Sequence, residues 1–207
     1  MKKALAIIFA VLGIDQAVKI WVKTSMYLGQ EHRIFDWFII HFTENNGMAF
    51  GLELGGEFGK ILLTLFRIGA VVGLFYLLKQ LLKKGAPNLS TIAFSLIIAG
   101  ALGNILDSVF YGLIFSDSYG QLASFFPEGG GYAGLFQGRV VDMLYLPIYK
   151  GFLPEWIPFK GGDYFVFFRP VFNIADTAIT VGVLILLLFQ RNTLSLLDFQ
   201  GTEKAEN

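Results

Sequence analysis

The sequence predicts an α-helical integral membrane protein, with four transmembrane helices and a small extracytoplasmic domain that contains β-strands and loop insertions. Hydrophobic residues make up 55% of the 207 residues, and a soluble core of this length could not bury so much apolar surface. Four stretches also approach the roughly 20 apolar residues that a helix needs to cross a bilayer. Both observations place the chain among multi-pass membrane proteins.

The four predicted transmembrane helices belong to one membrane-embedded domain, residues 1–207, and cover about residues 4–22, 60–78, 89–106 and 171–189. The first helix follows a basic start, Lys2 and Lys3, as the apolar region of a secretory signal peptide does. No cleavage site of small residues follows it. We therefore interpret this segment as a retained helix.

Lysine and arginine residues in the short connections predict the orientation of these helices. They gather before the first helix, after the second and after the fourth, at Lys2, Lys3, Lys79, Lys83, Lys84, Arg191 and Lys204. All of them fall on one side of the membrane if both termini are cytoplasmic. Residues 190–207 then form a cytoplasmic tail, and residues 23–59 and 107–170 are extracytoplasmic.

The extracytoplasmic segments are rich in glycine and aromatic residues. Residues 34–43 predict one or two strands because Phe, Ile and Trp favour extended structure, and residues 44–47 (ENNG) predict a turn. Residues 163–169 predict another strand, and residues 113–138 predict a loop excursion. The aromatic rings suit either the packing of a small domain or the headgroup level of a membrane.

Composition also excludes several classes of protein. The net charge is +0, so no basic excess suggests a nucleic-acid partner. The absence of cysteine excludes disulfides, zinc-thiolate sites and a cysteine nucleophile. His32 and His41 are the two histidines, so a Ser-His-Asp triad or a multi-histidine metal site has few candidate members.

Two copies of an N-x-x-D pattern lie at the outer ends of predicted helices. Asn104 and Asp107 end the third helix, and Asn173 and Asp176 begin the fourth, so both pairs are expected at one membrane level. A spacing of three places both side chains of a pair on one helix face. Helix capping explains Asn173, but Asp107 opposes the helix dipole at a C-terminal end.

Other charges stand within apolar stretches. Asp15 and Lys19 are four residues apart on the first helix, and the simplest interpretation is an ion pair whose lysine reaches toward the headgroups. Arg67 has two interpretations that the sequence leaves open, because it could reach toward the interface or neutralise a carboxylate. Asp142 lies in the apolar run RVVDMLYL.

These acids and amides predict a polar site near one membrane surface. Two carboxylates held close together cannot both ionise cheaply, so one keeps its proton while the other accepts one. Such a pair can take a proton from water and give one to a leaving amine. The alternatives are a Ca²⁺ or Mg²⁺ site, a polytopic transporter or proton/ion relay that uses intramembrane aspartates, and an inert structural membrane protein.

Five ordered segments resemble the motifs of the lipoprotein signal peptidases, or signal peptidase II. They are DQAVK (15–19), NNGMAFG (45–51), AGALGNILD (99–107), GRVVDM (138–143) and FNIADTAI (172–179). The resemblance implies an aspartic endopeptidase whose catalytic dyad is Asp142 and Asp176. It also implies supporting or substrate-binding roles, without metal or cofactor, for Asp15, Lys19, Asn45, Gly47, Asn104, Asp107, Arg139 and Asn173.

The resemblance further implies the substrate and the location. Members of this family remove signal peptides from diacylglyceryl-modified prolipoproteins and cut before the lipidated cysteine. We therefore expect prolipoproteins and membrane lipids as partners, a monomeric protein, and a site at the outer face of the bacterial cytoplasmic (inner) membrane. The fold implied is a four-helix bundle with a β-sheet cradle and a periplasmic helix.

The chain departs from the family pattern in two ways. Ser108 follows Asp107 where the family usually has arginine, and Arg139 and Arg67 are candidates to supply the missing charge. The intervals from Asp107 to Asp142 and from Asp142 to Asp176 are both longer than in typical members. We therefore expect the family's dyad together with an altered outer domain.

Overall fold

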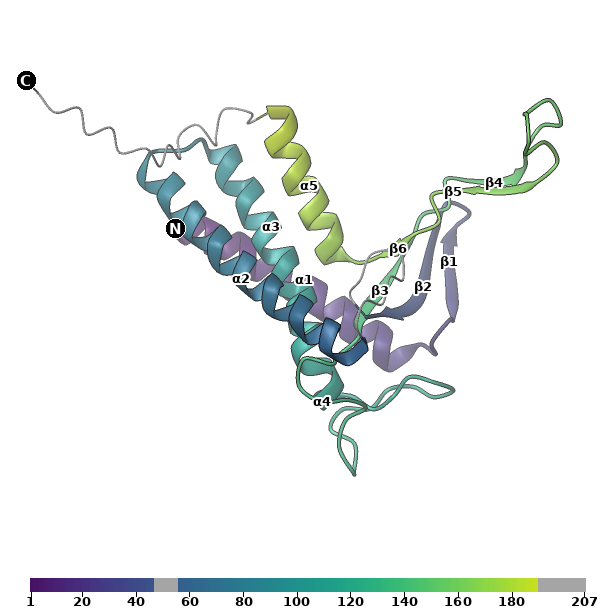
Figure 1. Cartoon of the computed structure of the whole chain (residues 1–207), viewed down its shortest axis with the longest axis horizontal. Helices are drawn as coiled ribbons and strands as arrows, with labels where there is room; N and C mark the ends of the chain where they lie inside the picture. Colours follow the sequence, from purple (N-terminus) through teal and green to yellow (C-terminus); the bar gives the residue numbers. More distant parts are fainter. Residues whose placement is uncertain (47–55, 190–207) are drawn as a thin grey trace, which may run out of the picture.

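Four helices form a bundle in the computed structural model, which describes residues 1–46 and 56–189. They are α1 (Lys2–Ser25), α2 (Gly56–Lys83), α3 (Asn88–Leu106) and α5 (Ile174–Phe189). The start of α1, the α2–α3 connection and the end of α5 lie at one end of the bundle (Figure 1). This arrangement confirms the predicted helical membrane fold.

Three helical segments within the described residues have the length and the apolar composition that crossing a membrane requires. The described part of α5 has 16 residues, which extends about 24 Å at 1.5 Å per residue. The fourth helix was predicted from residue 171, but Val171 and Phe172 form the short strand β6 (Val171–Phe172). They pair with Tyr145 and Leu144, so α5 begins only at Ile174.

The third helix, α3, ends at Leu106 as the sequence predicts, but helical structure continues beyond it. Asp107–Tyr111 form a π-helix (η2), and α4 (Gly112–Ile114) continues it, so the apolar helical span runs from Asn88 to Ile114. Asp107 is therefore internal to the helical segment, and the conflict expected with a terminal dipole does not arise. The wider π turn lies beside the polar site described below, as such turns often do.

An antiparallel sheet stands at the other end of the bundle, in the order β1-β2-β3-β6. Its longer strands are β1 (Glu31–Phe35), β2 (Phe38–Asn45) and β3 (Val140–Tyr145). The first two confirm the strands predicted within residues 34–43. The turn predicted at residues 44–47 is wrong in its first half, because β3, distant in sequence, pairs with Glu44 and Asn45 through Val141 and Val140.

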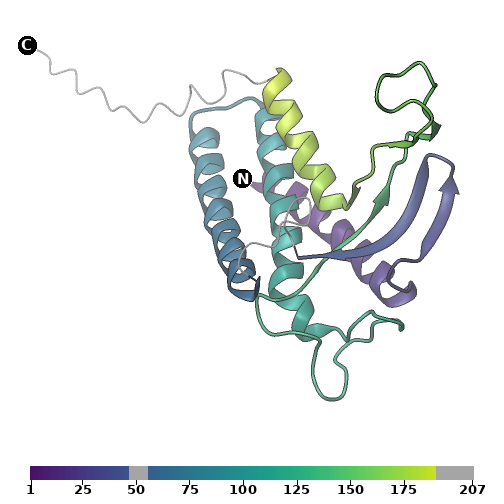
Figure 2. The same cartoon turned by 45° about the vertical axis from the view of Figure 1, so that its right-hand side comes forward.

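A second, separate hairpin consists of β4 (Tyr149–Phe152) and β5 (Tyr164–Phe167), which confirms the strand predicted within residues 163–169. It projects away from the helices (Figures 1 and 2). The excursion predicted at residues 113–138 is also confirmed. After α4, residues 115–138 contain no regular helix or strand, and a single isolated bridge joins Phe115 and Phe125.

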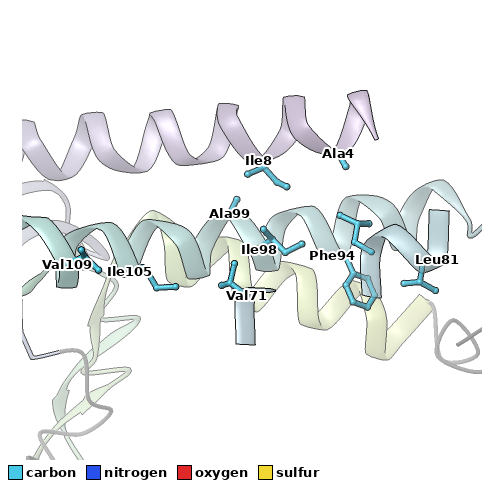
Figure 3. Packing of buried hydrophobic residues seen from close by; sticks show 10 residues of the cluster. Ala4, Ile8, Val71, Leu81, Phe94, Ile98, Ala99, Ile105 and Val109 are labelled. Carbon is cyan, nitrogen blue, oxygen red and sulfur yellow. The ribbon is translucent and has the colours of Figure 1, made fainter. Parts of the chain in front are cut away.

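The apolar core lies between α1, α2 and α3 and includes Ile8, Val71, Phe94 and Ile98 (Figure 3).

Glycines let the helices that carry the polar site approach closely, because small residues allow backbones to touch. A Cβ atom at Gly103 would lie 2.6 Å from Asp15 Oδ2. Gly103 thus leaves room for the Asp15 carboxylate against α3.

Candidate active site

The polar site lies where α1, α3 and α5 meet the strands β2 and β3. One continuous hydrogen-bonded cluster joins eight of the residues that the sequence predicts for it: Asp15, Lys19, Asn45, Asn104, Asp107, Asp142, Asn173 and Asp176. Gly47 lies outside the described residues. Arg139 belongs to a neighbouring cluster.

Asp142 occupies the middle of β3 and is 3% exposed. The side-chain amides of Asn45 and Asn173 both donate to its carboxylate, the second at 2.7 Å. Burial, together with the negative charge of Asp176, raises the pKa of Asp142 to about 7. Asp142 therefore binds a proton near neutral pH much more readily than an ordinary aspartate.

Asp176 lies in the first turn of α5, where Asn173 Oδ1 accepts the Asp176 backbone N–H at 2.8 Å. This bond confirms that Asn173 caps the helix. Asn104 Nδ2 donates to Asp176 Oδ1 at 2.8 Å, and Arg67 interacts electrostatically with the same carboxylate. An amide donor, an arginine and the start of a helix thus surround the carboxyl group of Asp176.

Lys19 is completely buried and makes three polar contacts with its ammonium group. Its Nζ lies 3.0 Å from Asp15 Oδ2, 2.8 Å from Asp107 Oδ2 and 2.9 Å from Asn104 Oδ1. The predicted pair with Asp15 is confirmed, but the reach toward headgroups is wrong, because two buried carboxylates hold the lysine inside. Since Lys19 donates to Asn104 Oδ1, it orients the Asn104 amide so that Nδ2 faces Asp176.

Asp15 and Asp107 also bind the backbone that carries the two acidic residues Asp142 and Asp176. Asp15 Oδ1 accepts the N–H of Ala175 at 2.8 Å, and Asp107 Oδ2 accepts the N–H of Val141 at 3.2 Å. Ala175 directly precedes Asp176 in the chain, and Val141 directly precedes Asp142. The supporting acids thus hold α5 and β3 against α1 and α3.

The charge next to Asp107 comes from Lys19, so neither of the predicted arginines takes that place. Arg139 Nη1 contacts Glu44 Oε2 at 3.2 Å and Asp117 Oδ2 at 3.4 Å. Burial lowers the pKa of Arg139, but its bonds and charge interactions with Glu44 and Asp117 outweigh this effect and raise the pKa overall. Ser108, at the position where arginine is usual, donates to the Asn104 carbonyl oxygen at 2.9 Å.

Sequence reasoning missed three residues of this region. Gln16 donates to Asp107 Oδ1 at 2.9 Å and to Asp15 Oδ2 at 3.2 Å. Lys23 is completely buried, binds Glu44 and donates to Ser118 Oγ at 2.8 Å. The spacing of four residues from Asp15 through Lys19 to Lys23 was a signal for the lysine, whereas Gln16 and Glu44 had none.

The geometry is suited to general acid–base chemistry. Asp142, a buried carboxyl with a pKa near 7, interacts electrostatically with Asp176, whose carboxyl group accepts a hydrogen bond from Asn104. One group can hold a proton while the other withdraws one from water. In the described ranges, no group of three or more His, Asp or Glu side chains is arranged to hold a metal ion.

Comparison with known proteins gives three consistent results. The family model for signal peptidase (SPase) II matches residues 7–191. A lipoprotein signal peptidase of Porphyromonas gingivalis is 54% identical over 95% of this chain and 86% of that protein, and one of Amoebophilus asiaticus is 37% identical over 94% and 80%. A bacterial membrane enzyme solved by the in meso method shares the fold, with a TM-score of 0.58, 23% identity, and coverage of 100% of this chain and 96% of that one.

Proposed function

This chain belongs to the signal peptidase (SPase) II family, and on that premise we propose that Asp142 and Asp176 are its catalytic dyad. The protein is a bacterial aspartic peptidase that removes signal peptides from prolipoproteins. The observation that carries the dyad assignment is the hydrogen-bonded path from buried Asp142 through Asn173 and Asn104 to Asp176, and the raised pKa of Asp142, about 7, agrees with it. The comparisons give no support to the alternative of a transporter or ion relay.

In the proposed mechanism, Asp142 carries the proton that the two carboxylates share. Asp176 takes a proton from a water molecule, which attacks the scissile carbonyl carbon. Asp142 gives its proton to the carbonyl oxygen as the tetrahedral intermediate forms. When the C–N bond breaks, Asp176 passes its proton to the departing amine, and a hydroxyl of the intermediate returns a proton to Asp142 as the carboxyl product forms. Each acid–base step of this kind typically contributes about 10²–10⁴-fold in rate.

Asn45, Asn104 and Asn173 orient the two carboxylates in this scheme. Asn45 and Asn173 donate to Asp142, and Asn104 donates to Asp176. Lys19 fixes the amide of Asn104 in turn. Because every one of these side chains comes from one chain, we propose that the enzyme acts as a monomer.

We propose that the substrate carries diacylglyceryl on a cysteine and is cut on the N-terminal side of that residue. The site lies at the sheet end of an apolar helix bundle, so the lipid could stay in the bilayer while the peptide bond reaches the dyad. Cleavage of matched prolipoprotein peptides with and without diacylglyceryl, followed by mass spectrometry, tests this proposal. Equal rates on both peptides, or a cut elsewhere, would overturn it.

We also propose that both termini are cytoplasmic, with the dyad at the outer face of the inner membrane and the whole chain forming one membrane-embedded domain. The lysines of the α2–α3 connection support this orientation. Because the chain has no cysteine, single substitutions report on each side. A membrane-impermeant maleimide should label Glu128→Cys in intact spheroplasts and Lys84→Cys only after permeabilisation. The opposite pattern would reverse the orientation.

A further inference from the structure

The β4–β5 hairpin lacks the packing that ordinarily stabilises two strands. Within the described residues it forms a sheet of two strands, separate from the four-stranded sheet. A hairpin of two strands is marginally stable in water unless something covers it. Both views show it extending beyond the helices (Figures 1 and 2). Among residues 1–46 and 56–189 no third strand joins this hairpin, so a further surface that covers it would stabilise it.

Aromatic rings cover both faces of this hairpin. The register pairs Tyr149 with Phe167 on one face and Phe152 with Tyr164 on the other. Each of these four rings is about half exposed or more, and Phe152 and Tyr164 contact each other with centroids 5.4 Å apart. Exposed apolar rings that gather in one place mark a contact with a partner or a membrane.

The tip loop, residues 153–163, presents two further rings from an ordered backbone. Leu153 and Asp163 are joined by a backbone hydrogen bond of 2.9 Å, and Gly162 donates back to the Leu153 carbonyl oxygen at 3.0 Å. Trp156 is 81% exposed, and Phe159 is fully exposed with a φ of 66°. That φ is unfavourable for a bulky residue. The loop thus keeps the Phe159 ring exposed at the surface although its backbone is strained.

We propose that this hairpin and its tip loop dock into the headgroup region of the adjoining membrane leaflet. The hairpin belongs to the part of the chain at the sheet end of the bundle, where the helices that cross the membrane end. Tryptophan and tyrosine settle at this level because each ring has an apolar body and a polar edge. The lipid surface would cover both the exposed strands and the tip.

The near balance of charges on the hairpin indicates that its aromatic rings, and not charge attraction, would bind the membrane. Residues 149–169 contain three basic side chains and two acidic ones: Lys150, Lys160, Arg169, Glu155 and Asp163. Opposite charges nearly cancel, so anionic lipid should add little attraction. The docking is therefore expected in neutral phosphatidylcholine as well as in membranes that contain phosphatidylglycerol.

Depth-dependent quenching of Trp156 tests the proposal on the full chain. The protein has three tryptophans, and Trp21→Phe with Trp37→Phe leaves Trp156 as the single fluorophore. In phosphatidylcholine nanodiscs, a spin label near the headgroup should quench its emission more than a label near the chain end. A variant that keeps only Trp21, which is half exposed on α1, verifies that lipid labels quench in the assay.

Three results would overturn the proposal. Trp156 emission that no lipid label quenches, while aqueous acrylamide does, would place the tip in water. Quenching that needs phosphatidylglycerol would contradict the aromatic basis of docking, and quenching that needs added prolipoprotein would assign the hairpin to the substrate. The readout does not depend on cleavage, so its failure is distinguishable from failure of the proposed dyad.

Discussion

At the scale of residues, the protonation of Asp142 depends on opposing influences. Burial and Asp176 disfavour its negative charge, whereas the amide donors Asn45 and Asn173 favour it. The balance gives a pKa of about 7, compared with 3.8 for an ordinary aspartate. The folded protein therefore keeps a proton on Asp142 between these two values, where the unfolded chain has lost it. This residue's contribution to stability should fall as pH rises through that window.

The same balance predicts how activity changes with pH. If Asp142 acts as the protonated acid, kcat/KM should fall as pH rises through about 7. Asn45→Ala removes a donor that stabilises the carboxylate, so the alkaline limb should move to higher pH. Asn88→Ala, at an exposed amide that meets Lys3, is the matched control and should leave the limb in place. If the alkaline limb of Asn45→Ala does not shift, the titration of Asp142 does not cause that limb.

At the scale of elements, one buried side chain couples the start of α5 to the proposed dyad. Asn173 caps the helix with its oxygen and donates to Asp142 with its nitrogen. Asn173→Ala should lower the free energy of unfolding by about 1 kcal/mol through the lost cap and should also reduce cleavage. Asn173→Ser can restore the cap without reaching Asp142, so its stability should recover while its activity stays low. Full activity in the serine variant would show that capping alone is needed.

A buried charge cluster joins the strands β2 and β3 on the sheet face opposite to Asn45 and Asp142. Glu44 binds Lys23 and Arg139, and Ser118 Oγ donates to it at 2.9 Å. Glu44 precedes Asn45 in β2, while Arg139 precedes β3, so the cluster ties the excursion and both strands to α1. The excursion thus contributes to holding the strands that carry Asn45 and Asp142.

Removing the charge of Glu44 should therefore be costly. Glu44→Gln leaves Lys23 buried without its carboxylate, which typically costs about 3–5 kcal/mol. Asp36→Asn breaks an exposed pair with Arg33, in which Asp36 is 96% exposed, and should cost less than about 1 kcal/mol. Chemical unfolding in detergent compares the two variants. Equal small losses would mean that the cluster does not hold the strands.

At the scale of the whole molecule, the sequence was informative where function constrains local patterns. Asp142, Asp176 and the two N-x-x-D pairs could be found because charged residues are rare in apolar runs. The role of Lys19 could not, because its partner Asp107 lies on another helix and its burial depends on how the two helices pack. Asn45 looked like a turn residue for the same reason, since only its pairing with Val140 makes it part of a strand.

The central claim is that Asp142 and Asp176 together cleave the prolipoprotein. Turnover of a diacylated prolipoprotein by purified, detergent-folded Asp142→Asn and Asp176→Asn tests it, with Asp163→Asn on the exposed hairpin as the matched control. Each dyad variant should lose cleavage while its thermal unfolding stays near that of the wild type, and the control should keep both. Normal turnover in either folded dyad variant would contradict the claim.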